Sequence, residues 1–95
     1  MNDLDLTRRL KILRRSVLML ETELRNDHMD NDLLADIDRQ MEEGLAAEPR
    51  TAFLRERVDA LRENVMGSGS HRFRDAIRST AELRDAIEEV MALQG

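Results

Sequence analysis

The sequence predicts an all-helical protein, a small bundle of four helices. Apolar residues recur about every 3.5 positions along several stretches, most regularly over residues 6–24, and no stretch shows the strict alternation of a strand. Charged residues make up 37% of the chain and aromatic residues only 2%, so the core must consist of Leu, Ile, Val, Met and Ala. A chain of 95 residues is expected to form one domain, spanning residues 1–95.

The first helix is expected over residues 4–25. Its apolar residues follow a 4-3-4-3-4 spacing, which predicts coiled-coil-like packing along the length of other helices. Asp3 or Asp5 can cap the first turn, because a short acidic side chain accepts hydrogen bonds from free N–H groups there. A turn rich in Asn and Asp follows at residues 26–32. The apolar residues of this helix are Leu6, Leu10, Leu13, Val17, Leu20 and Leu24.

The second helix is expected over residues 32–43, and Asp30 or Asn31 can cap it. Gly44 suits the left-handed residue that ends a helix. The third helix is expected over residues 50–66, with Pro49 marking its first turn, where the missing N–H costs nothing. The apolar stripes of these helices are Leu33, Leu34, Ile37 and Met41, and then Leu54, Val58, Leu61 and Val65.

The clearest break in the chain is the Gly-Ser-Gly-Ser run at residues 67–70, which we expect to be a flexible joint. Such a run also occurs in engineered chains, and the sequence leaves both origins open. The fourth helix is expected over residues 71–93, with one polar member, Thr80, in its apolar stripe. The stripe consists of Phe73, Ile77, Thr80, Leu83, Ile87 and Val90.

The first helix carries more apolar surface than one neighbouring layer needs. Ile12 and Met19 share a position about 130° from the centre of the main stripe, and Leu4 and Leu18 share another. Two apolar faces require neighbours on both sides, so we expect a second copy, or a helix of another protein, to cover the surplus. The alternative is a compact monomer with this helix at its centre. The expected interface comprises Ile12, Leu13, Val17, Leu18, Met19, Leu20 and Leu24.

The net charge of −5 conceals a strong asymmetry along the chain. Residues 1–20 carry five basic and two acidic side chains, whereas residues 21–48 carry ten acidic and two basic ones. The basic residues could contact nucleic-acid phosphates, or they could pair with the acidic second helix, which holds Glu42 and Glu43. The acidic chain and the lack of interleaved aromatic residues favour the second interpretation. The basic cluster comprises Arg8, Arg9, Lys11, Arg14 and Arg15.

Several classes of site are not predicted. The absence of cysteine excludes disulfides and thiolate catalysis, and no apolar run is long enough to span a bilayer. We therefore expect a cytoplasmic protein without membrane association. The acidic turn at residues 27–38 does not match the spacing of a calcium loop, and nothing pairs His28 or His71 with a nucleophile. We predict no catalytic, cofactor-binding or metal-binding residues, and hence no enzyme.

These observations predict a non-enzymatic oligomerisation or adaptor protein that assembles through the apolar faces of the first helix. The alternative is a nucleic-acid-handling subunit that displays the basic end of this helix around a ring. In size and helical content the chain is compatible with the helical ring core of phage small terminase subunits, which bind DNA at packaging sites. On that analogy the five basic residues of the cluster would contact DNA. The partner, the number of subunits and the spatial order of the helices are not encoded in these patterns.

Overall fold

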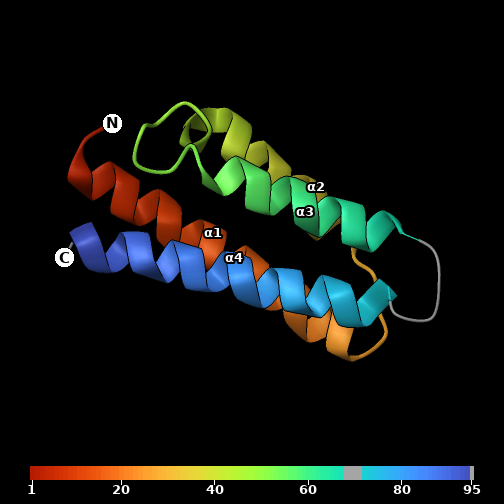
Figure 1. The fold of residues 1–95 in the computed structure, drawn as a ribbon. Helices are drawn as coiled ribbons and strands as arrows, with labels where there is room; N and C mark the ends of the chain where they lie inside the picture. The colour runs from red at the N-terminus through yellow and green to blue at the C-terminus, as the bar shows by residue number, and fades with distance from the viewer. Residues whose placement is uncertain (68–71, 95) are drawn as a thin grey trace.

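Residues 1–67 and 72–94 are described by a computed structural model, and within them the protein has four α-helices and no strand. The helices are α1 (Asp3–Arg25), α2 (Asn31–Gln40), α3 (Leu54–Met66) and α4 (Arg72–Gln94). They run alternately in opposite directions along a body of 42 × 20 × 19 Å, and both chain ends lie at the same end of it (Figure 1). The predicted all-α bundle is confirmed. Apart from Gly67, the predicted joint at 67–70 lies outside the described residues, as does residue 71.

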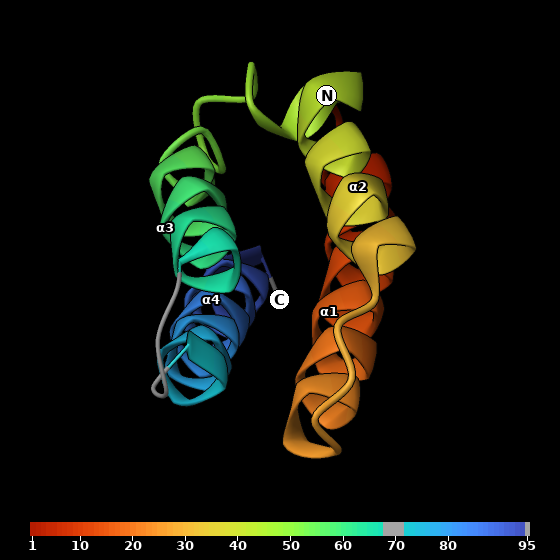
Figure 2. The ribbon, with the colours of Figure 1, turned by 90° about the vertical axis from the view of Figure 1, so that its right-hand side faces the viewer.

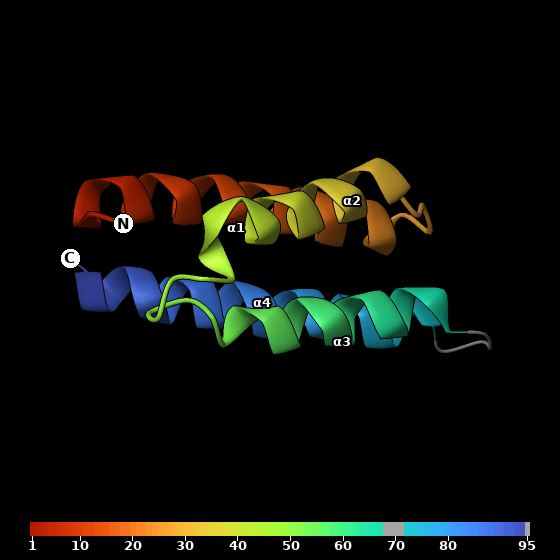
Figure 3. The same cartoon turned by 90° about the horizontal axis from the view of Figure 1, so that it is seen from above.

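The bundle consists of two helical hairpins. The view along the bundle shows α1 and α2 as one layer and α3 and α4 as the other (Figure 2), and the view from above shows the same pairing (Figure 3). α4 packs along both α1 and α3, so it links the layers. The six apolar residues that were predicted at 4-3 spacing in the first helix all face this interior. The buried apolar core is formed by Leu6, Leu10, Leu13, Val17, Leu20, Leu24, Ile37, Met41, Leu45, Leu54, Val58, Leu61, Val65, Ala76, Leu83, Ala86, Ile87 and Val90.

The connection between α2 and α3 differs from the prediction. α2 ends at Gln40 and continues as one π-helical turn, η1 (Met41–Leu45), in which Gly44 has the predicted positive φ, at 154°. Residues 46–53 then form turns, so α3 begins at Leu54 and not at residue 50. The buried Thr51 stabilises these turns, because its hydroxyl donates a 2.7 Å hydrogen bond to the Leu45 carbonyl. Pro49 lies in this connection and not in the first turn of a helix.

The helix caps agree in part with the prediction. Asn2, and not Asp3 or Asp5, caps α1: its side-chain oxygen accepts a 2.8 Å hydrogen bond from the Asp5 N–H. Asp30 caps α2, as predicted, by accepting a 3.1 Å hydrogen bond from the N–H of Leu33. Asn and Asp suit this position equally, because each has a side-chain oxygen that can accept the hydrogen bond.

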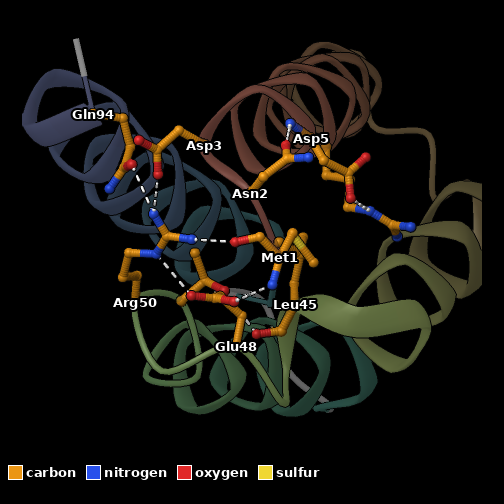
Figure 4. Close-up of polar contacts among 10 residues, drawn as sticks. Met1, Asn2, Asp3, Asp5, Leu45, Glu48, Arg50 and Gln94 are labelled. Carbon is orange, nitrogen blue, oxygen red and sulfur yellow. Dashed lines mark hydrogen bonds and ion pairs between the residues drawn. The ribbon is translucent and has the colours of Figure 1, made fainter.

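One arginine ties three segments together at the end of the bundle where the chain begins and ends (Figure 4). Arg50 donates hydrogen bonds to Asp3 (2.7 Å), Gln94 (3.0 Å), Glu48 (2.7 Å) and the Met1 carbonyl (2.8 Å). The Glu48 hydrogen bond raises the pKa of Arg50, and the same contact lowers the pKa of Glu48. These contacts fix the start of α1, the 46–53 connection and the end of α4 relative to one another.

A membrane span is not found among the described helices, since none of them combines the length and the apolar character that crossing a bilayer requires. The finding agrees with the sequence, in which charged residues interrupt every apolar stretch.

Candidate interaction faces

Four of the seven residues expected at a partner interface lie in the core of the single chain. Leu13, Val17 and Leu20 are 0% exposed and Leu24 is 1% exposed. A partner that docks on the folded monomer therefore does not reach them. The physical reason is that a 4-3 stripe indicates lengthwise packing on a helix, but it does not say whether that helix belongs to the same chain. In this structure the helices that pack on α1 are α2 and α4 of the same chain.

The remaining interface residues stay at or near the surface. Ile12 is 52% exposed, Met19 is 48% exposed and Leu18 is half-buried. Ile12 lines a groove of about 240 Å³ between α1 and the α2–η1 segment. Met19 follows one heptad later, so at 100° per residue it lies on the same side of the helix. The groove is lined by Asp5, Arg8, Arg9, Ile12, Gln40, Glu43 and Leu45.

Two members of the basic cluster are engaged within the chain. The Nε of Arg9 lies 3.3 Å from a carboxylate oxygen of Asp5, and its Nη1 donates a 3.3 Å hydrogen bond to the Glu43 carbonyl. Arg14 reaches across to α4, where its Nε lies 3.1 Å from Glu88. Internal pairing therefore occurs, but with Asp5, a backbone carbonyl and α4. These two arginines do not form the expected ion pairs with the side chains of Glu42 and Glu43.

The other three basic residues, Arg8, Lys11 and Arg15, are exposed and make no hydrogen bond or ion pair with any residue in the described ranges. Two of them alternate with the exposed apolar residues at a 4-3-4 spacing, which places all four on one side of α1. We refer to this set, Arg8, Ile12, Arg15 and Met19, as the α1 stripe.

A second exposed apolar region lies on α3 and α4, and the sequence analysis did not identify it. Phe53 is 46% exposed and Leu93 is 80% exposed. Two neighbouring hollows contain Phe53: one of about 330 Å³ reaches Leu93 and Glu89, and one of about 270 Å³ reaches Glu56 and Glu82. On α4 the residues of this face again follow a 4-3-4 spacing. We refer to this set, the exposed Glu82, Glu89 and Leu93 together with the buried Ala86 between them, as the α4 stripe.

The signal for the second region is present in the sequence but weak. Leu93 is the second-last residue of the last helix, and Phe53 stands just before the third helix. Neither belongs to a long periodic run. Only the folded chain brings the start of α3 beside the end of α4. The one sequence pattern that indicates this face is the seven-residue spacing of two acidic residues, Glu82 and Glu89.

Glu23, His28 and Asp30 converge where α1 turns into α2, with one potential ligand atom of each within 4.8 Å of the others. Burial and the neighbouring Asp30 carboxylate raise the pKa of Glu23, whereas the hydrogen bond from the Leu33 N–H lowers the pKa of Asp30. These residue types suit a divalent cation. Asp30 is already engaged as the cap of α2, however, so the cluster has a structural role at this turn.

Comparison of the chain with protein-family models, with curated proteins and with solved structures finds no match. Function is therefore inferred from surface geometry and charge. The two exposed apolar regions belong to opposite layers of the bundle, one on α1 and α2 and the other on α3 and α4 (Figure 2). Charged residues of both signs line both regions. On the first, Arg8 and Arg15 have no hydrogen-bond or ion-pair partner within the described ranges, and on the second lie the carboxylates Glu82 and Glu89.

Proposed function

We propose that the protein is a non-enzymatic helical assembly module that binds a second copy of itself through the outer face of α1. The observation that carries the proposal is the exposure of Ile12 and Met19, at 52% and 48%, on a helix whose core-facing stripe is fully buried. Side chains of this size gain free energy when water is removed from them. Two of them in line beside a groove are typical of a surface that another helix covers.

The energetics predict an assembly that depends on concentration. Full burial of a large apolar side chain contributes about 1.5–3 kcal/mol, so covering two half-exposed side chains contributes roughly that amount in total. Association itself costs about 4–15 kcal/mol in lost freedom of motion. Ile12 and Met19 alone therefore do not hold two copies together, and the surrounding groove and charged residues have to contribute as well.

The experiment is a mass measurement by light scattering at two protein concentrations. We expect the wild-type chain to show a mass above the 11.0 kDa of one copy, rising with concentration. Replacement of both Ile12 and Met19 by Asp should return the mass to that of one copy, because it places two charges in the contact. Circular dichroism of the variant should match the wild type, since both side chains lie outside the core.

A matched control is Met66→Asp, which introduces the same charge at an apolar residue that is 76% exposed at the end of α3. We expect this variant to assemble like the wild type. A wild-type mass of one copy at every concentration contradicts the proposal, as does unchanged assembly of the double variant. In the first case a helix of another protein becomes the remaining occupant of the face.

Nucleic-acid binding is the second candidate, and the observation that favours it is the exposure of Arg8, Lys11 and Arg15, which have no partner among the residues that the structure describes. Their spacing places the three cations along one side of α1, where an assembly would repeat them and multiply a weak contact. We expect a mobility shift of duplex DNA at low salt that is lost when all three become Ala. The absence of any shift at low salt rules this function out.

A further inference from the structure

We infer that assembly is head-to-tail: the α1 stripe of one copy packs antiparallel on the α4 stripe of the next copy. This inference rests on the proposed self-assembly through α1 and specifies what covers that helix. Such a contact joins two different surfaces, so a two-copy complex still has one free surface of each kind, and every copy can bind two neighbours. The assembly therefore grows beyond two copies, as a closed ring or an open filament.

The arrangement of the layers brings the two stripes together. α1 and α2 form one layer and α3 and α4 the other, with α1 beside α4 (Figure 2). A copy displaced sideways by about one bundle width, 19–20 Å, places its α1 beside the outer side of the first copy's α4. Each face of the bundle measures 42 by about 20 Å, so an interface that buries about 800 Å² per partner needs most of one face, including the helices beside α1 and α4.

The register follows from contacts that the chain already makes between the same two helices. Within one copy Arg14 pairs with Glu88 across antiparallel α1 and α4. A sideways displacement without sliding keeps this level, so the next residue on each helix, Arg15 and Glu89, comes opposite its counterpart in the neighbouring copy. Neither residue makes a hydrogen bond or ion pair with another described residue of its own chain.

The same register matches the apolar members of the two stripes. Ile12 lies three residues before Arg15, and Leu93 lies four residues after Glu89, so these two residues come opposite each other. Both are more than half exposed in the single chain. In the other direction Met19 comes opposite Ala86, which is 6% exposed and belongs to the core of its own chain, so it offers Met19 little apolar surface. Ile12 thus meets Leu93 and Arg15 meets Glu89, which is the complementarity expected between adjacent antiparallel helices.

A charge swap tests the contact. Replacing Arg15 by Glu, or Glu89 by Arg, places like charges opposite each other between copies, and we expect each single variant to weaken assembly by about fivefold or more. The double variant R15E/E89R restores an opposite pair at the wild-type net charge, and we expect its assembly to return to within about twofold of the wild type. Sedimentation equilibrium at fixed salt measures all four chains, and circular dichroism checks their helix content.

A second measurement is independent of charge. Leu93→Asp blocks only the α4 stripe and Ile12→Asp blocks only the α1 stripe, so each variant alone should remain at the 11.0 kDa of one copy. An equimolar mixture should stop at a two-copy complex, because one intact surface of each kind remains. Glu63→Arg, at an exposed α3 carboxylate outside both stripes, is the control for E89R and should assemble normally.

The outcomes separate this inference from the proposed function. If Ile12→Asp abolishes assembly but Leu93→Asp and E89R leave it intact, the α1 face binds a copy of itself, and the head-to-tail arrangement is overturned while self-assembly stands. If R15E/E89R assembles no better than the single variants, the Arg15–Glu89 register is overturned. If the wild type never exceeds one copy, both proposals fall together.

Discussion

Leu13 distinguishes a core that belongs to one chain from an interface between chains. The 4-3 spacing alone would place this residue at the centre of a contact with a partner, whereas the structure encloses it completely within one copy, at 0% exposed. Replacing Leu13 by Ala should therefore lower the free energy of unfolding of the monomer. It should do so equally at low and high protein concentration.

The magnitude follows from complete burial. Removing the outer atoms of a fully buried Leu forfeits their transfer free energy and leaves a cavity that closes only in part, which together cost about 2.5–5 kcal/mol. A domain of this length has a total stability of roughly 5–14 kcal/mol. The substitution should thus remove a large fraction of the total and lower the Tm by about 10 °C or more.

Urea unfolding followed by circular dichroism is the appropriate assay, because the chain has no Trp or Tyr for fluorescence. The measurement is made at two protein concentrations. Met19→Ala is the comparison: this side chain is 48% exposed in the single chain, so its loss should change monomer stability by less than about 1 kcal/mol. If Leu13→Ala leaves the dilute protein as stable as the wild type but lowers its mass, the assignment of Leu13 to the intrachain core is refuted.

Three further predictions concern the turns. Gly44→Ala should destabilise the fold by about 1–3 kcal/mol in urea, since φ is 154° and a Cβ would lie 3.1 Å from the first methionine; equal midpoints would contradict this. Glu23→Gln should raise the Tm at neutral pH. Burial and Asp30 raise this pKa, so the stability linked to Glu23 is present below its ordinary value of 4.5 and is lost as the pH rises through the folded value; a gain that persists unchanged in acid would refute it. Glu48→Gln should lower the Tm at neutral pH only, because Arg50 lowers the pKa of Glu48 and the linked stability, present above 4.5, is lost as the pH falls through the folded value. Calorimetry across pH measures both carboxyl variants.

The helices with long apolar stripes could be predicted from the sequence. The six-residue stripe of α1 specifies one buried face whatever packs on it, so the bounds of α1 differ from the expectation by a single residue. The identity of the neighbour could not be predicted in the same way. Leu13 and Ile12 are both apolar and adjacent in sequence, but only the arrangement of α2 and α4 leaves one buried and the other half exposed.

The start of α3 could not be predicted because it depends on contacts from distant parts of the chain. Pro49 is a residue type that favours the first turn of a helix, so the local sequence predicts a helix start there. The hydrogen bond of Thr51 to Leu45 and the contacts of Arg50 with the two chain ends instead hold residues 46–53 as turns. These partners of Arg50 lie at the two ends of the chain, and Leu45 lies outside the predicted helices. The residues around Pro49 alone therefore do not indicate these contacts.

The candidate faces illustrate the same limit. The exposed apolar pair on α1 was predictable, since Ile12 and Met19 fall on a second line of one helix. The face that includes Phe53 and Leu93 was not, because its residues come from the start of one helix and the end of another. Their proximity is a property of the up-and-down order of the helices, which hydrophobic periodicity does not specify.

Because residues near both termini bind Arg50, the protein is suited to circular permutation. Asp3 and Gln94 accept hydrogen bonds from the same guanidinium nitrogen, so a peptide of a few Gly and Ser residues could bridge them. New ends could then be opened in the turn between α1 and α2, and the circularly permuted polypeptide would retain every helix. Labels attached at those new ends would sit far from the sealed junction.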